Sequence, residues 1–203
     1  MRPHRVLRVV AVAVIPFLLG APCHQSQPAV YNTGPGGAGN SGSSLSVTPA
    51  GPVVSWSANS SPPNGTWQQI LSMINAQRNA QGMSSLVWHD GLAAEAQYHS
   101  SDMLKQNYLS LVAPQGYDVF QQLVNASPAI SFTNVFAIVF EYDVSQNGGN
   151  QALNVFNALM GNSSSKAALM TPAMTHFGGN GHGPPYANNL NHETVFVGQN
   201  VAP

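Results

Sequence analysis

Apolar residues recur at helical spacing in the stretch that follows residue 65. Thr66 and Gln69 have the spacing of a capping box, which predicts the start of a helix there. Gly82 is placed to end this helix. Between them, four apolar residues fall at i, i+3, i+4 and i+7, on one helical face: Trp67, Ile70, Leu71 and Ile74.

Two more helices are predicted before Pro128. Asp90 has the position of an N-cap for the first of them, and the second covers Tyr117–Asn125. The first has an inner stripe at helical spacing: Leu92, Ala96, His99 and Met103.

The remainder of the chain is predicted as strands around one further helix. Residues 132–142 are rich in β-branched and aromatic residues, which indicates a strand or a buried segment of undecided type. A turn at 146–149 precedes a helical run of apolar residues. Residues 175–180 and 194–201 are predicted as two strands joined by a long Gly-, Pro- and Asn-rich loop. This order predicts an α+β domain. The apolar positions of its fourth helix are Ala152, Leu153, Phe156, Leu159 and Met160.

The N-terminal third of the chain has a different character. Residues 1–23 combine a basic start with an apolar run that is short for a membrane span and contains Pro16, so they are predicted to be a signal peptide. An uncleaved anchor helix is the alternative. Residues 24–65 are rich in Gly, Ser and Pro and have no helical period, which predicts a disordered linker that tethers a folded domain. Within it, Val53, Val54 and Trp56 form the one local apolar cluster.

Cys23 is the only cysteine, so no disulfide framework exists. Its place directly after the apolar run suggests a bacterial lipoprotein whose Cys23 is lipidated, although Pro22 fits that processing site poorly. The alternative is a cysteine that is lost with the signal peptide or left exposed after ordinary cleavage.

Charge is scarce and unevenly placed. Only 6% of the residues are charged, and Arg2, Arg5 and Arg8 are three of the six basic ones. Without the signal peptide, three basic and seven acidic residues leave a net charge of −4. Such a chain has no surface that could neutralise phosphates, which excludes nucleic acid and anionic membranes as partners.

The stretch from residue 70 to 103 resembles the opening of the CAP superfamily, the SCP/Tpx-1/allergen-like domain, in its bacterial secreted form. That form has a helix with an IN-x-x-R run, a G-x-x-x-L-x-W link and a helix of the type L-A-x-x-A-x-x-H-x-x-x-M. The resemblance implies a CAP-like α-β-α sandwich over residues 66–203, with a small antiparallel sheet between helices. The matching residues are Ile74, Asn75, Arg78, Gly82, Leu86, Trp88, Leu92, Ala93, Ala96, His99 and Met103.

The resemblance also implies a cleft with a tetrad of two His and two Glu that can hold a divalent metal. The family's Y-F-S-H-x-x-P-x-G run corresponds to 108–116 and sets Leu111 at the first His position. The G-E-N-I-A run sets Thr133 at a Glu position and keeps Asn134, and the S-P-G-H-R run sets Ser165 at the second His position. The second Glu has no counterpart that we can place. Since an alkyl group and two hydroxyls are poor ligands and poor proton carriers, we expect no metal, no other cofactor and no catalytic residue in this cleft.

Other groups offer weaker chemistry. His176, His182, His192 and Glu193 gather late in the chain, but their spacing matches no metal motif, and a solvated loop is the alternative. His99 is expected to be a buried core histidine bonded to backbone, as this family commonly has at this position.

Glu141 and Asp143 would share one face of a strand without an identifiable partner, which favours a role at the edge of a turn. Ser165 and Lys166 are adjacent and would point apart on a helix, so a Ser/Lys nucleophile is disfavoured. The Ser-rich stretch 163–165 is instead predicted to cap the helix that follows it.

These observations predict an exported, extracellular or envelope-associated protein that is non-catalytic and binds an apolar ligand or an envelope component. The apolar run Phe132–Phe140 would be either a central strand or the wall of a hydrophobic groove enlarged by Leu111. A cell-envelope hydrolase or protease with an unrecognised site is the alternative from another class. A structural or interaction protein held at the surface by its tether is the third.

Overall fold

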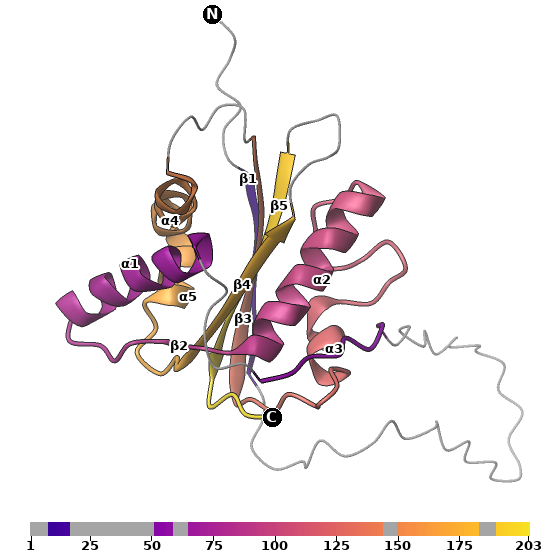
Figure 1. Ribbon diagram of the computed structural model, residues 1–203, viewed down its shortest axis with the longest axis horizontal. Coiled ribbons are helices and arrows are strands. Elements are labelled where there is room, and N and C mark those ends of the chain that lie inside the picture. Colours follow the sequence, from indigo (N-terminus) through magenta and orange to yellow (C-terminus); the bar gives the residue numbers. More distant parts are fainter. Residues whose placement is uncertain (1–7, 17–50, 59–64, 144–149, 183–189) are drawn as a thin grey trace, which may run out of the picture.

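A five-stranded sheet stands between two layers of helices (Figure 1). This computed structural model describes residues 8–16, 51–58, 65–143, 150–182 and 190–203. The strands are β1 (Arg8–Pro16), β2 (Val87–Trp88), β3 (Asn134–Asp143), β4 (His176–His182) and β5 (Leu190–Gln199). The helices are α1 (Thr66–Ala80), α2 (Asp90–Gln106), α3 (Val119–Val124), α4 (Gln151–Gly161) and α5 (Ser163–Leu169). This architecture confirms the predicted α-β-α sandwich.

The sheet has the order β1-β3-β5-β4-β2. β3, β5 and β4 pair antiparallel, β1 pairs antiparallel with β3, and β2 pairs parallel with β4. β4 and β5 are the predicted closing hairpin, whose loop lies outside the described residues. The segment 132–142, whose type the sequence left open, forms most of strand β3, and its successive side chains point to opposite faces of the sheet.

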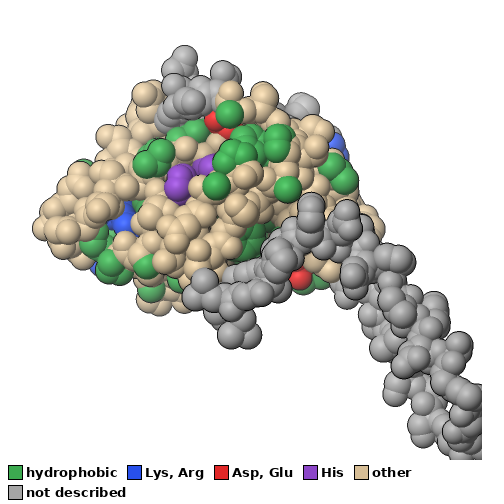
Figure 2. Space-filling model, turned by 90° about the horizontal axis from the view of Figure 1, so that it is seen from below, with side chains coloured by type: hydrophobic (Ala, Val, Ile, Leu, Met, Phe, Trp, Pro, Cys, Tyr) green, Lys and Arg blue, Asp and Glu red, His purple; other side chains and the backbone are tan. Residues whose placement is uncertain are grey.

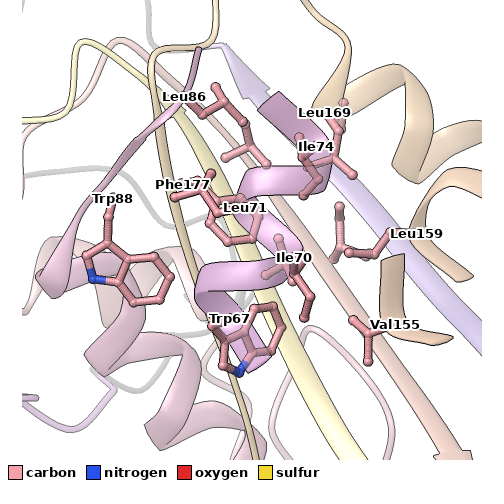
Figure 3. Close-up of a cluster of buried hydrophobic side chains, with 14 of the residues drawn as sticks. Trp67, Ile70, Leu71, Ile74, Leu86, Trp88, Val155, Leu159, Leu169 and Phe177 are labelled. Carbon is pink, nitrogen blue, oxygen red and sulfur yellow. The ribbon is translucent and has the colours of Figure 1, made fainter. Parts of the chain in front are cut away.

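Two apolar cores lie on opposite faces of the sheet. On one face, α1, α4 and α5 pack over β3, β5 and β4 (Figure 1), and Figure 3 shows Trp67 and Ile70 of α1 facing Val155 and Leu159 of α4. On the other face, α2 and α3 cover the sheet. Alternation along β3 supplies both cores: Val135, Ala137 and Val139 enter the second, whereas Ile138 and Phe140 enter the first.

The helix starts differ from prediction by a residue or two. α1 begins at Thr66 itself, after Gly65, and no side chain caps it, so the predicted capping box is wrong. α2 is capped by His89, whose Nδ1 accepts a hydrogen bond from the Leu92 N–H at 3.3 Å. The predicted cap, Asp90, instead accepts from the Trp88 indole N–H at 3.0 Å. Sequence spacing cannot distinguish His89 from Asp90 as the cap, because an imidazole nitrogen can accept a backbone N–H hydrogen bond just as a carboxylate can.

The shorter helices are capped by residues that the sequence analysis did not identify. α3 starts at Val119 with a capping box, in which Asp118 and Gln121 bond each other's backbone N–H groups. α5 is capped by Asn162, whose Oδ1 accepts from the N–H groups of Ser164 and Ser165. The Ser-rich stretch therefore follows its cap instead of supplying it.

The end of the predicted linker packs on the domain. Residues 51–58, called the strap below, run beside the segment after α3. The Trp56 N–H donates to Ser127 O at 2.9 Å, and the Trp56 indole N–H donates to Pro128 O at 2.7 Å. Apolar residues thus order the last part of a stretch whose composition indicates disorder. The rest of the predicted linker lies outside the described residues, apart from Gly65.

Within the predicted signal peptide, Arg8–Pro16 forms β1, at the outer edge of the sheet. Cys23 lies outside the described part of the chain. Among the described residues, no helix has the length and apolar character that a membrane span requires.

Candidate functional site

Leu111 is a core residue. It lies in the loop after α2, is 8% exposed and belongs to the apolar core on the α2 face. Its carbonyl accepts the Val119 N–H at 3.0 Å, which fixes the loop against the start of α3. The side chain at the first predicted cleft position therefore contributes to packing and presents no polar atom.

Thr133 and Asn134 join the start of β3 to the end of β5. The Thr133 hydroxyl accepts from the Asn200 amide at 3.2 Å, and the Asn134 amide donates to the Gln199 Oε1 at 2.7 Å. The polar groups of both side chains are therefore used in hydrogen bonds that join β3 to the end of β5.

Ser165 is fully buried in the first turn of α5, and its hydroxyl donates to the Asn162 Oδ1 at 3.1 Å. α5 lies on the opposite face of the sheet from the core that holds Leu111 (Figure 1). The structure therefore does not bring Leu111 and Ser165 into one cluster.

His99 is a buried core histidine, as predicted. Its Nε2 lies 2.9 Å from Ser110 O and its Nδ1 lies 3.2 Å from the Gln122 Oε1. Burial lowers the pKa of His99, so the neutral ring is the favoured form. The histidine ties α2 to α3 and to the loop that carries Leu111.

A tyrosine–aspartate network fixes the same loop. The Asp102 Oδ2 accepts from the Tyr108 hydroxyl at 2.8 Å and from the Tyr117 hydroxyl at 3.3 Å. Burial, together with the Asp102 carboxylate, raises the pKa of both tyrosines, so they stay protonated donors. The network orients the loop and offers no base.

Glu141 and His192 form a carboxylate–imidazole pair that the sequence did not predict. They stand opposite each other on β3 and β5, and the His192 Nε2 lies 3.7 Å from the Glu141 Oε2. His192 is 3% exposed, and its Nδ1 has no hydrogen-bond partner among the described residues. Burial lowers the pKa of His192, and Glu141 opposes that shift. The imidazole is therefore a neutral base beside a half-exposed carboxylate.

The partner of Glu141 is thus His192, which corrects the interpretation of Glu141 and Asp143 as a strand pair without a partner. Strand register was the missing signal, because residues directly opposite on antiparallel strands share a face. Glu193 lies on the other face, close over Gly181. The side chain of Asp143 is not described.

The late histidines are separated along the hairpin. His176 begins β4, whereas the register sets His182 opposite His192 at the far end, about 20 Å away at the usual rise per residue. The side chain of His182 is not described. Within the ranges that the structure covers, no three His, Cys, Asp or Glu residues are grouped as a metal would require.

His176 instead lies beside His89, at the end of the sheet where β2 meets β4. Their ring centroids are 5.7 Å apart, and the Trp56 ring lies 5.2 Å from His89. Burial lowers the pKa of both histidines, and for His89 the neighbouring His176 adds to the effect. Figure 2 views the molecule from this end and shows histidine side chains with hydrophobic ones gathered around them.

Comparison with known proteins agrees with this architecture. Among solved structures, an outer surface protein from Borrelia burgdorferi is 16% identical and has a TM-score of 0.54, with 68% of this chain and 96% of that one covered. An extracellular protein containing an SCP domain from Bacillus anthracis is 18% identical and has a TM-score of 0.51, with 65% of this chain and 39% of that one covered. These likenesses show the fold.

No curated protein sequence matches the chain. The model of the CAP family, described as the cysteine-rich secretory protein family, matches residues 71–197. That region includes most of α1, all of α2 to α5 and all but the last two residues of β5, so it spans more than half of the chain. The chain therefore belongs to the CAP family.

Proposed function

We propose that this CAP-domain protein is exported and acts by binding an apolar ligand or an apolar part of an envelope component, without catalysis. The family assignment and the outer-surface and extracellular relatives support the exported location. The basic and apolar N-terminal residues supply the export signal in this proposal.

The observation that carries the proposal is that the predicted cleft residues take part in the packing and the hydrogen bonds of the fold. Leu111 is packed in a core, and the hydroxyls of Thr133 and Ser165 are bonded to Asn200 and Asn162. Polar groups that are already engaged inside a fold have little capacity to ligate an ion or to move a proton. Recognition at the surface is the activity that these residues leave open.

The end of the sheet seen in Figure 2 is the best candidate for that surface. Val87 of β2 is 59% exposed there, next to His89 and opposite His176 in the parallel register. Because the pKa of both histidines is lowered, the rings are neutral at pH 7. His89 is itself buried, so the contact surface is the neutral, partly exposed ring of His176 with the exposed Val87 side chain, which together favour an apolar partner.

The test is to incubate the purified domain with an envelope lipid extract and to identify what it retains by mass spectrometry. Val87→Asp places a charge on the proposed surface and should reduce retention at least fivefold. Leu153→Asp is the matched control, since Leu153 is 44% exposed on α4, which packs on one face of the sheet away from its β2 end (Figure 1). Equal retention by both variants, or none by the unaltered protein, would contradict the proposal.

The Glu141–His192 pair favours a second candidate, a cell-envelope hydrolase. A buried, neutral imidazole beside a carboxylate is a group that can act as a general base. Zinc titration and a screen of ester, peptide and glycan substrates would test this candidate. Activity that is lost in both His192→Gln and Glu141→Gln, with unchanged thermal stability, would place the hydrolase first.

A further inference from the structure

The outer edge of β3 is occupied along most of its length by β1. The pairing is antiparallel and runs from Arg8 opposite Glu141 to Pro16 opposite Asn134, with one irregularity between Val9 and Ala11. Figure 1 shows β1 alongside β3 at this border of the sheet, with α5 packed on the same side as α1 and α4. β3 thus has a strand on each side in the full chain.

The described side chains of the two cores all follow β1 in the chain. Their buried residues lie between Trp67 and Val201, and the strap begins at residue 51. The matched family region, 71–197, also begins after β1. A chain that starts at residue 24 keeps all of these residues and the strap, and its β3 becomes the edge strand.

β3 has few of the features that protect edge strands. Its ten residues include no Pro, Gly or Lys, and its only charged residues are Glu141 and Asp143 near one end. Long apolar edges without such features pair readily with another strand. The opposite border of the sheet is formed by β2, which is only two residues long. The two borders therefore differ in their capacity to bind a strand.

We propose that the outer edge of β3 is a strand-binding site that β1 fills in the unprocessed chain and that an extended apolar peptide strand fills after the signal peptide is removed. The affinity comes from main-chain hydrogen bonds to β3, as in other β-strand additions. This site lies at the outer edge of the sheet, whereas the surface proposed for apolar ligands lies at the sheet's β2 end. This proposal rests on the export signal of the proposed function but not on that surface, so loss of peptide binding with lipid retention intact would count against the strand-binding site alone.

β1 indicates the chemistry of the occupant. Apart from Arg8, its residues are apolar, and proline stands only at its last position. The register sets this basic residue opposite Glu141. The preferred ligand is accordingly an extended, apolar peptide strand with a basic residue near its N-terminus, running antiparallel to β3.

The test uses the chain that begins at residue 24 and, as the probe, a labelled synthetic peptide with the sequence of residues 8–16. We expect saturable binding, with slower amide hydrogen exchange in Asn134–Asp143 and unchanged exchange in His176–His182. A control peptide with Ala11→Pro and Val12→Pro lacks N–H groups on both sides of the strand and should bind at least tenfold more weakly. A peptide with Arg8→Glu should bind several-fold more weakly.

Equal binding of the proline peptide, or exchange in β3 that the probe does not change, would overturn the proposal. So would protection of β3 without any peptide in a chain that sediments as a dimer, because a second copy would then be the occupant. In the full chain, Ala11→Pro with Val12→Pro should accelerate exchange in β3, which tests the same edge without truncation.

Discussion

At the scale of single residues, Glu95 departs furthest from ordinary protein chemistry. It is 1% exposed on α2, and neither carboxyl oxygen has a hydrogen-bond partner among the described residues. Burial raises the pKa of Glu95 to about 8. Burying an ionised carboxyl without a partner is costly, so the folded protein holds this group protonated.

Glu95 makes stability depend on pH. Below the ordinary pKa of 4.5 the carboxyl is protonated in both the folded and the unfolded chain, so its ionisation does not lower the free energy of unfolding. Between about 4.5 and 8 only the unfolded chain ionises Glu95, so the Glu95 contribution to the free energy of unfolding falls as pH rises, by up to about 1.4 kcal/mol per pH unit. Buried histidines with lowered pKa values oppose this fall below pH 6.5, so the contribution is read from the difference between the Glu95→Gln variant and the unaltered protein. We expect Glu95→Gln to remove this slope and to stabilise the protein at pH 8, as measured by urea unfolding.

The control for this experiment is Gln97→Glu, which adds a carboxyl at an exposed position of the same helix and should leave the pH dependence unchanged. A urea series in which Glu95→Gln keeps the slope of the unaltered protein would show that another group titrates in this range.

Arg78 is a fully buried cation on α1 that bonds four backbone carbonyls, one in the loop before β2 and three between the end of α5 and β4. Its guanidinium donates to the carbonyls of Ser84, Leu169, Thr171 and Met174. Burial lowers the pKa of Arg78, but the group remains charged because its ordinary value is so high.

We expect Arg78→Lys to cost at least about 3 kcal/mol, because hydrogen bonds to charged groups contribute about 1.5–3 kcal/mol each and a lysine cannot span four acceptors. Lys105→Met, on the exposed end of α2, should change stability by less than about 0.5 kcal/mol. Chemical denaturation of both variants tests this prediction, and similar unfolding midpoints would contradict the stabilising role of Arg78.

At the scale of elements, the pairing of β4 with β5 requires a glycine at position 181, which lies opposite Glu193. A Cβ at Gly181 would lie 1.6 Å from the Glu193 Oε2, so any side chain there must displace a buried carboxylate. Gly181→Ala is expected to destabilise the protein by about 1–3 kcal/mol, the range for overpacked sites. Gly161→Ala is the matched control, since a Cβ at the end of α4 meets nothing within 4 Å. Comparable unfolding midpoints for the two variants would exclude this close approach.

The elements also show which signals a sequence carries. Helical periodicity predicts α1, α2 and α4 correctly, because each helix has a row of apolar residues on the face that packs in a core. Ile70, Leu92 and Leu159 are members of these three rows. It could not identify His89 as a cap, since its neighbour Asp90 has the same capping chemistry. The sequence does not predict the Glu141–His192 pair, because the pair depends on the register of β3 with β5. These two strands are separated in the chain by α4, α5 and β4, so no short turn between them specifies that register. The positions assigned by family resemblance, such as Ser165, were chosen without knowing which face of the sheet they occupy.

At the scale of the whole molecule, the boundary of the folded domain lies earlier than the change in composition at residue 65 indicates. The strap is bonded to the segment after α3 through Trp56, Ser127 and Val54, and Gly51 packs on Gln122 and Tyr117. Gln122 is itself fully buried and bonded to His99, so the strap covers the polar groups between α2 and α3.

Two truncated chains test this boundary, and neither contains β1. A chain that starts at residue 51 keeps the strap, and a chain that starts at residue 65 loses it. The shorter chain exposes Tyr117 and Gln122 and loses four hydrogen bonds, so we expect it to be less stable by about 2–4 kcal/mol, in the range of large core truncations. Trp56→Ala in the longer chain should reproduce most of this loss, because the indole supplies both the packing and one of the bonds. Differential scanning calorimetry that finds equal transitions for the two chains would move the boundary back to α1. The strap would then be part of the tether, and the face of the molecule beside His89 would lose an aromatic neighbour that comes from outside the matched family region.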